Sequence, residues 1–298
     1  MIHGDNQKFD PEIDHMYMPS KWSKRHQCEQ IFLTYLTKES SDLRDVLKDW
    51  VEVVRYGKGQ KQIFEILRDP EVKEDAPIMI FLHGGYWVES DREIYLICAE
   101  PAAKRGFIGI IVGYDQAPDV SLTTIVNEIR DAYLFLSRRY TKCPSITLLG
   151  HSAGGHLGSM LMATNWKEYN TSGEKLIPIK RLVSLAPVLD LRPVVHISYN
   201  SYLHLTDDEI TNLSPLQQIE NSVHNMKIFG TKVLSVVGEH DPPVLKKKSG
   251  EYAEALKKNS IDSKYFEIPG LDHFEPIEQI REPDSFLAKC LFDEDGPL

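Results

Sequence analysis

The sequence has few cysteines, no long apolar run and no excess of positive charge, and each shortage excludes a class of protein. Its net charge is −10, from 34 basic and 44 acidic residues, which argues against nucleic acid and anionic membranes as partners. The longest apolar runs have strand length, far below the roughly 20 residues that a membrane span needs. The cysteines are too scattered for a disulfide framework and predict buried thiols in a reducing compartment. They are Cys28, Cys98, Cys143 and Cys290.

The beginning of the chain also lacks a targeting signal. Charged residues at Asp5, Lys8 and Asp10 leave no apolar core of the kind that a signal peptide contains, so we expect a cytoplasmic protein. With 298 residues, 42% hydrophobic and 26% charged, the composition is that of a globular chain. No linker divides it, and we predict one domain over residues 1–298 that begins with a helical segment over residues 1–45. The sequence leaves open whether the chain forms a homodimer.

Short apolar runs alternate with helical patterns, which is typical of a mostly parallel sheet flanked by helices. Two early runs alternate apolar with polar residues, as a half-exposed hairpin does, and later runs are almost wholly apolar, as strands covered on both faces are. The predicted strands are 51–54, 63–67, 78–82, 107–112, 146–149, 182–185, 233–237 and 264–268. Apolar residues at spacings of three and four predict helices over 93–104, 122–140 and 244–258.

Residues 190–230 interrupt this alternation, because they are polar and contain no apolar run of strand length. We expect a small insertion there that acts as a lid. It would cover the carboxyl edge of the sheet, where the active sites of open α/β sheets lie.

The pentapeptide Gly150-His151-Ser152-Ala153-Gly154 is the strongest chemical signal in the sequence. It follows a predicted strand and precedes a small-residue stretch that is compatible with a helix. A nucleophile elbow needs this arrangement, because its serine lies on a turn so sharp that the residues two positions away must be glycine. The alternative is a glycine-rich turn with an incidental serine. Phosphate-binding loops are excluded, since no lysine follows the glycines and position 152 is not glycine.

A serine nucleophile needs a base, and the base needs a carboxylate to orient it. On this scaffold the order along the chain is serine, acid, histidine, each after a later strand. His273 follows the last predicted strand, and Asp241 follows the strand before it, 32 residues earlier, about one helix-and-strand unit. We therefore predict Ser152, Asp241 and His273 as a catalytic triad. Glu239, in the same turn as Asp241, and Asp190, after the preceding strand, remain alternatives for the acid.

The tetrahedral intermediate of such a reaction carries an oxyanion that backbone N–H groups must stabilise. Gly84 and Gly85 follow a predicted strand, and Ala153 follows the serine, so we predict that these three amides form an oxyanion hole. A plain Gly-Gly loop is the alternative. The next two residues, Tyr86 and Trp87, are interpreted either as the wall of a pocket for a flat ring or as core anchors.

Metal-binding patterns are missing from the sequence. No H-E-x-x-H motif occurs, and His151 and His156 are five positions apart rather than four, so they do not share one helical face. We expect no metal site and no cofactor.

Three motifs together resemble the hormone-sensitive-lipase-like branch of the α/β-hydrolases, over about residues 60–280. They are His83-Gly84-Gly85, Tyr114-Asp115-Gln116-Ala117-Pro118 and Gly150-His151-Ser152-Ala153-Gly154-Gly155-His156. That branch usually has a third glycine where this chain has Tyr86. The string His83-Gly84-Gly85-Tyr86-Trp87, with Tyr17-Met18-Pro19-Ser20, is similar to the kynurenine formamidases (arylformamidases), in particular to insect members.

This resemblance implies an α/β-hydrolase fold that hydrolyses an aromatic formamide, N-formyl-L-kynurenine, to L-kynurenine and formate in tryptophan catabolism. It also implies that Ser152 attacks the formyl carbon, that His273 moves the protons and that Asp241 orients His273. A carboxylesterase of broad acyl specificity is the nearest alternative, since it would have the same triad. A catalytically inactive hydrolase scaffold that serves as a ligand receptor is a further alternative, which the presence of all three triad residues disfavours.

Overall fold

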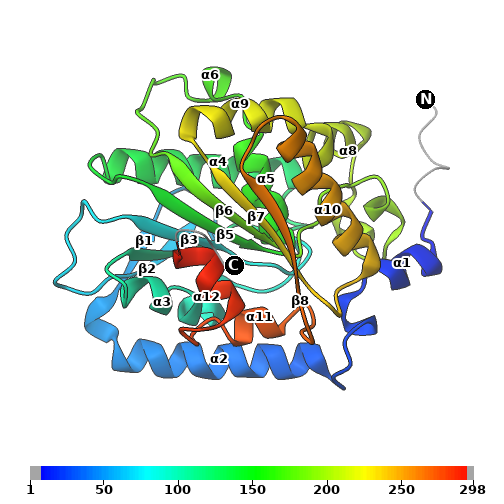
Figure 1. The fold of residues 1–298 in the computed structure, drawn as a ribbon, viewed down its shortest axis with the longest axis horizontal. Helices are drawn as coiled ribbons and strands as arrows, with labels where there is room; N and C mark the ends of the chain where they lie inside the picture. Colours follow the sequence, from blue (N-terminus) through cyan, green and yellow to red (C-terminus); the bar gives the residue numbers. More distant parts are fainter. Residues whose placement is uncertain (1–7, 294–298) are drawn as a thin grey trace.

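The computed structural model describes residues 8–293, and the first seven residues of the predicted N-terminal helical segment lie outside this range. An eight-stranded sheet forms the centre, in the order β1-β2-β4-β3-β5-β6-β7-β8, with helices against both of its faces (Figure 1). β1 and β2 pair antiparallel, as do β2 and β4, and all other neighbours are parallel. This is the mostly parallel sheet that the apolar runs predict.

Each of the eight strands overlaps a predicted one, and β6 begins three residues earlier than the predicted run 182–185. β3, β4 and β5 are buried along their whole length, because helices cover both sides of the sheet there. β1, at the sheet edge, is largely exposed. The predicted early hairpin and later buried strands are present, but of the two hairpin strands only β1 is exposed, because β2 lies between β1 and β4 and is almost wholly buried. The bounds are β1 Val51–Arg55, β2 Ile63–Leu67, β3 Ile78–Leu82, β4 Ile108–Val112, β5 Ile146–His151, β6 Ile179–Leu185, β7 Lys232–Gly238 and β8 Ser263–Ile268.

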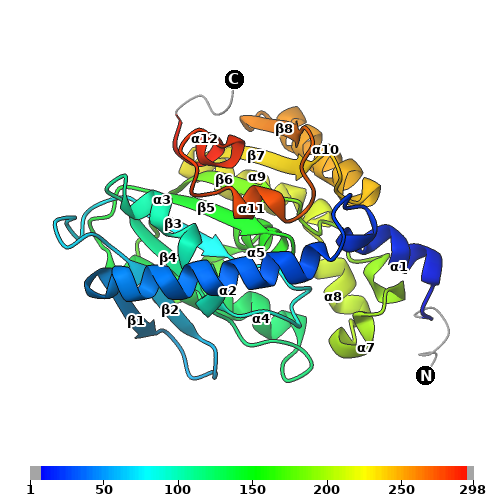
Figure 2. The ribbon, with the colours of Figure 1, turned by 90° about the horizontal axis from the view of Figure 1, so that it is seen from below.

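Helices form a layer on each face of the sheet (Figures 1 and 2). One layer consists of α4 Leu122–Arg139, α5 Ala153–Met162, α9 Ile219–Phe229 and α10 Pro243–Lys258. The other consists of α2 Cys28–Val46, η3 Arg92–Cys98, α3 Glu100–Ala103, α11 Glu275–Glu278 and α12 Phe286–Phe292. Each layer encloses its own hydrophobic core against the sheet. Within residues 8–293, no helix is both long and apolar enough to span a bilayer.

The remaining short helices lie near the chain's beginning and in the connections. They are α1 Pro11–Tyr17, η1 Pro19–Lys21, η2 Lys48–Trp50 and α6 Trp166–Tyr169. The predicted helical segment at the N-terminus is therefore built mainly from α1 and α2. α2 runs across the sheet (Figure 2) and brings its first turn to the carboxyl edge of the parallel strands.

One predicted helix, over residues 93–104, is wrong as a single element. The structure has two short helices instead, Arg92–Cys98 and Glu100–Ala103. Pro101 lies in the first turn of the second helix. Because proline has no N–H to donate to the carbonyl of Ile97, a continuous α-helix breaks at this point.

The segment over residues 190–230, predicted as a lid, joins β6 to β7 and is largely helical. Its short helices are η4 Val194–His196, α7 Asn200–Leu203, α8 Asp207–Asn212 and η5 Pro215–Gln217, followed by α9. α9 packs against α5 and β6. The part before α7 carries Tyr199 to the pocket described below.

Candidate active site

The serine of the central motif lies on a strained turn between β5 and α5. Ser152 has φ 54° and ψ −117°, a backbone conformation that non-glycine residues rarely adopt. A Cβ on Gly150 would lie 2.3 Å from the carbonyl oxygen of Gly154, and a Cβ on Gly154 would lie 2.0 Å from that of Leu82. The two glycines are therefore required by close backbone approach, as in a nucleophile elbow.

The predicted base and acid lie next to each other after the two neighbouring strands β7 and β8. Nδ1 of His273 is 2.6 Å from Oδ1 of Asp241, and the other carboxylate oxygen accepts a 2.6 Å hydrogen bond from the amide of Gly238. Both side chains are buried, at 3% and 2% exposure. Because Nδ1 donates to the carboxylate, Nε2 of His273 is the nitrogen left to exchange a proton.

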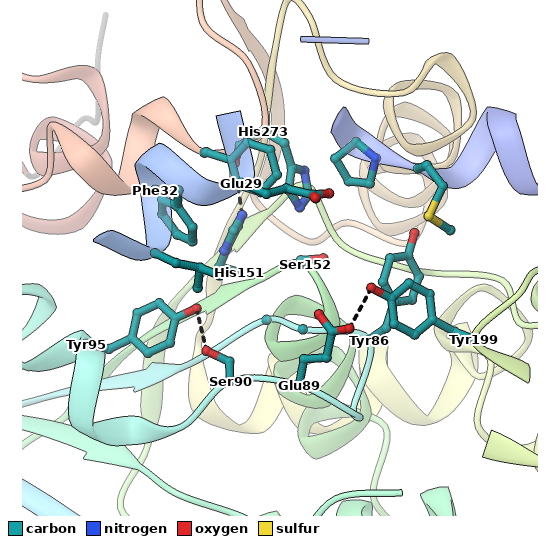
Figure 3. A pocket seen from close by; sticks show the side chains of 16 residues that line it. Glu29, Phe32, Tyr86, Glu89, Ser90, Tyr95, His151, Ser152, Tyr199 and His273 are labelled. Atoms are coloured by element: carbon teal, nitrogen blue, oxygen red, sulfur yellow. Dashed lines mark hydrogen bonds between the residues drawn. The ribbon is translucent and has the colours of Figure 1, made fainter. Parts of the chain in front are cut away.

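Ser152 and His273 line the same pocket (Figure 3). Ser152 is 5% exposed, and across residues 8–293 its hydroxyl makes no hydrogen bond to the protein. The hydroxyl is therefore free to turn toward His273 or toward a bound molecule. The structure thus brings the three predicted residues to one carboxyl edge of the sheet.

The two alternative acids are bonded elsewhere. Glu239 is exposed and accepts a 2.7 Å hydrogen bond from the amide of Gly270, which lowers the pKa of its carboxyl. Asp190 is buried, and burial alone would raise its pKa, but hydrogen bonds from Arg192 and then Lys248 hold the pKa below its usual value. Asp241 is the carboxylate that contacts His273.

The predicted oxyanion loop follows β3 and packs against the elbow. A Cβ on Gly84 would lie 3.0 Å from the Cβ of Ser152, and one on Gly85, whose φ is +108°, would lie 2.3 Å from the carbonyl oxygen of Glu89. In the described part of the chain, the amides of Gly84, Gly85 and Ala153 donate to no protein acceptor. Free amides beside a nucleophile are what an oxyanion hole needs.

Comparison with known proteins agrees with this geometry. The family model of the alpha/beta hydrolase fold matches residues 79–275, from the strand before the oxyanion loop to just past His273. The chain belongs to the α/β-hydrolases.

Relatives of this α/β-hydrolase include kynurenine formamidases from two animal groups. The one from Salmo salar is 28% identical over 283 residues, covering 94% of each chain. The one from Drosophila melanogaster is 27% identical over 296 residues, covering 94% of this chain and 96% of that one. A solved bacterial structure from a Silicibacter species matches with a TM-score of 0.77 at 23% identity, covering 94% of this chain and 98% of that one. The predicted resemblance to kynurenine formamidases is confirmed, and the fish and fly relatives are nearly equally similar.

In this α/β-hydrolase the loop is fixed by a buried aromatic stack. The ring of His83 lies between Tyr95, 5.5 Å away at 8°, and Tyr114, 4.3 Å away at 11°, and its Nδ1 donates to the carbonyl of Gly84 at 2.8 Å. Burial lowers the pKa of His83 to about 4, so the ring is neutral near pH 7. Tyr95 belongs to no motif in the sequence, so no sequence signal points to its place beside the loop.

The pocket has a volume of about 160 Å³, and five of its lining residues are phenylalanine or tyrosine. Tyr86 lines it and stacks on Tyr199 with ring centroids 4.4 Å apart at 15°, while its hydroxyl donates to the carbonyl of Tyr17 at 2.5 Å. The full lining is Met18, Pro19, Glu29, Phe32, Leu33, Gly84, Gly85, Tyr86, Glu89, Ser90, Tyr95, His151, Ser152, Tyr199, His273 and Phe274.

Trp87 corrects one interpretation of the sequence. Its side chain is fully buried in the core and meets the ring of His156 edge-on at 4.8 Å, and it is not part of the pocket lining. Trp87 is therefore an anchor in the hydrophobic core, whereas Tyr86 lines the pocket.

No cluster of three or more His, Cys, Asp or Glu side chains arranged to hold a metal ion is found between residues 8 and 293. The titratable side chains that line the pocket are two histidines, three tyrosines and two glutamates.

Proposed function

We propose that this α/β-hydrolase is a serine hydrolase that cleaves the aryl formamide bond of N-formyl-L-kynurenine, giving L-kynurenine and formate. The observation that carries the proposal is the 2.6 Å contact between His273 and Asp241, with His273 and Ser152 on one pocket. Kynurenine formamidase relatives that cover 94% of the chain support the choice of substrate.

The first half of the reaction transfers the formyl group to the enzyme. Nε2 of His273 takes the proton of the Ser152 hydroxyl while the Oγ atom bonds to the formyl carbon, and the carbonyl oxygen becomes an oxyanion. The amides of Gly84, Gly85 and Ala153 stabilise that charge, and losing one such donor typically costs about 3–4 kcal/mol in the barrier.

The C–N bond then breaks, and His273 gives its proton to the departing aryl amine. This protonation matters because the amine leaves poorly as an anion. In the second half, His273 takes a proton from water, whose oxygen attacks the formyl ester. Collapse of this second intermediate releases formate and returns the proton to Ser152.

The pocket suits a small acyl group on a flat ring. Its volume of about 160 Å³ is below the roughly 300–1,000 Å³ of pockets for drug-sized ligands. Tyr86 and Tyr199, which are stacked on each other, and Phe32 provide aromatic surface against which an aryl ring can pack.

The test compares the formyl group with longer acyl groups on aryl leaving groups. Purified protein, without added metal or cofactor, is given an aryl formamide, an aryl formate ester and aryl esters of longer acids, and kcat/KM is measured for each. We expect the formyl compounds to be preferred. A strong preference for butyryl or larger acyl groups would show a carboxylesterase instead.

A receptor without catalytic activity is distinguished by covalent labelling. A fluorophosphonate or sulfonyl fluoride probe should modify Ser152, identified by peptide mass spectrometry, because only an activated serine reacts quickly. An unlabelled Ser152 in folded protein would favour the receptor.

A further inference from the structure

The pocket that holds Ser152 has a negatively charged mouth. Two carboxylates, Glu29 and Glu89, belong to its lining, and none of the lining residues is a lysine or an arginine. Glu29 lies in the first turn of α2, and Glu89 follows the oxyanion loop. Both residues are exposed, whereas Ser152 is 5% exposed at the floor, with its hydroxyl unpartnered within the described residues.

The two carboxylates lie on either side of the space in front of Ser152. Figure 3 shows their side chains pointing from opposite sides toward the middle of the pocket. Oε1 of Glu89 accepts a 3.1 Å hydrogen bond from the hydroxyl of Tyr199. Burial raises the pKa of Tyr199, and the negative charges of Glu89 and then Glu29 raise it further, so both carboxylates act on one phenol.

Neither carboxylate is neutralised by the protein. Across residues 8–293, Glu29 and Glu89 form no ion pair with a lysine or an arginine. Two other buried carboxylates, by contrast, are paired: Asp272 with Arg25 and Asp190 with Arg192. Two unpaired negative charges at the mouth of a substrate pocket attract a cation and repel an anion.

We propose that Glu29 and Glu89 bind the ammonium group of the substrate, so that the enzyme selects aryl formamides that carry a primary amine. This inference rests on the proposed function and names the residues that determine the substrate specificity of the enzyme. In N-formyl-L-kynurenine the ammonium nitrogen is six bonds from the formamide nitrogen. The molecule can therefore reach from Ser152 at the floor to the carboxylates at the mouth.

The same arrangement has a consequence for the carboxylate of the substrate. Because the lining offers it no lysine or arginine, it turns toward solvent and experiences the repulsion of Glu29 and Glu89. The substrate class is thus wider than the amino acid. A decarboxylated analogue, an aryl formamide with an ortho 3-aminopropanoyl group, should be hydrolysed at least as efficiently as N-formyl-L-kynurenine.

The experiment uses three aryl formamides: the amino acid, its decarboxylated amine, and a butyrophenone that matches the amine in size because a methyl group replaces the ammonium. We measure kcat/KM for each at low ionic strength. The wild-type enzyme should prefer the amine to its neutral isostere, and raising the salt concentration should reduce this preference through screening.

The variants are Glu29→Gln, Glu89→Gln and the double variant, with Glu93→Gln as the matched control. Gln retains an acceptor for Tyr199, and Glu93 is exposed, outside the pocket and paired with Arg92. The amine-to-isostere preference should fall about threefold in each single variant and about tenfold in the double variant, as expected for partly exposed ion pairs. The control should keep the wild-type preference.

An unchanged preference in the double variant would overturn the inference, as would a wild-type enzyme that clearly favours the amino acid over the decarboxylated amine. Hydrolysis of none of the three formamides would refute the proposed function itself, and this inference with it. That outcome is recognisable, because kcat/KM for the neutral isostere is then also zero.

Discussion

The side chain of His151 lies next to His273 and affects how His273 can act as a base. The backbone carbonyl of His273 accepts a 3.0 Å hydrogen bond from Nε2 of His151, and the two rings lie 4.6 Å apart. Burial, and then the nearby His273, lower the pKa of His151 well below its usual value. His151 therefore stays neutral and does not repel the positive charge that forms on His273 during turnover.

Replacing the base should separate catalysis from binding. His273→Ala should lower kcat by a factor on the order of 10³ or more with little change in KM, because the imidazole acts on the reacting proton and not on substrate binding. Steady-state kinetics on an aryl formamide measure both constants. Full activity in this variant would mean that another group is the base.

The acid is identified by a pair of amide substitutions. Asp241→Asn should lower kcat on the order of 10³–10⁴-fold, because the amide no longer holds the imidazole in the required tautomer. Glu239→Gln should remain near wild type, since its carboxylate bonds only to a loop amide, that of Gly270. A mild effect at 241 with a severe effect at 239 would reverse the assignment.

At the level of elements, the chain's N-terminal segment holds the loop that carries His273. The carboxylate of Asp272 accepts hydrogen bonds from the hydroxyl of Ser23 at 2.6 Å and from Nε of Arg25 at 2.8 Å. Arg25 also binds Glu278 in α11 at 2.8 Å. The same segment supplies part of the pocket lining, so the site is completed by residues almost 250 positions from the base.

Arg25→Met should therefore affect both stability and turnover. Losing its hydrogen bonds leaves the carboxylate of Asp272, which is 1% exposed, with fewer partners, at an expected cost of about 1–3 kcal/mol in the free energy of unfolding. The loop that carries His273 also loses its hydrogen bonds to Arg25, so kcat should fall several-fold. Urea unfolding and kcat per titrated active site are the measurements.

Arg281→Met is the matched control, because Arg281 makes comparable bonds to Glu100 and Glu39 without touching the His273 loop. It should lower stability by a similar amount and leave kcat unchanged. Equal kinetic effects of the two variants would show that Arg25 has no special relation to the site.

The elements also show what the sequence could and could not predict. Wholly apolar runs are local signals for buried strands. The motifs around Ser152, Asp241 and His273 are also local, and the structure brings these three residues to the same edge of the sheet, as the motifs predict. Pro101 is also a local signal for a helix break, but the apolar spacing over residues 93–104 predicts one continuous helix. The contacts of Arg25 with Asp272, and the approach of Glu29 to the pocket, depend on how α2 crosses the sheet. No pattern along the chain encodes that placement.

At the scale of the whole molecule, the fold buries neutral histidines on both sides of the sheet. Burial lowers the pKa of His83 and of His156 to about 4, and His151 is shifted in the same direction. His83 belongs to the oxyanion loop, while His156 packs in α5 with its Nε2 donating to the carbonyl of Leu213 at 2.7 Å.

These histidines should make the protein sensitive to acid. Below about pH 6.5, His83 and His156 each bind a proton in the unfolded state, but in the folded state they do so only near pH 4. The free energy of unfolding should therefore fall as the pH decreases from about 6.5 to about 4, by up to about 3 kcal/mol for each of these two rings. Urea unfolding across this range measures the slope.

His156→Gln tests the contribution of one ring, because Gln cannot take up the proton. The variant should lose less stability than the wild type between about pH 6.5 and pH 4. An identical slope in both proteins would show that protonation of His156 is not linked to unfolding.

The most direct test of the account follows both products of one reaction. N-formyl-L-kynurenine is incubated with purified wild-type protein and with Ser152→Ala, and formate and kynurenine are quantified over time. The account predicts equal amounts of the two products from the wild type and none above background from Ser152→Ala. Comparable release by Ser152→Ala, or no release by the wild type, would contradict it.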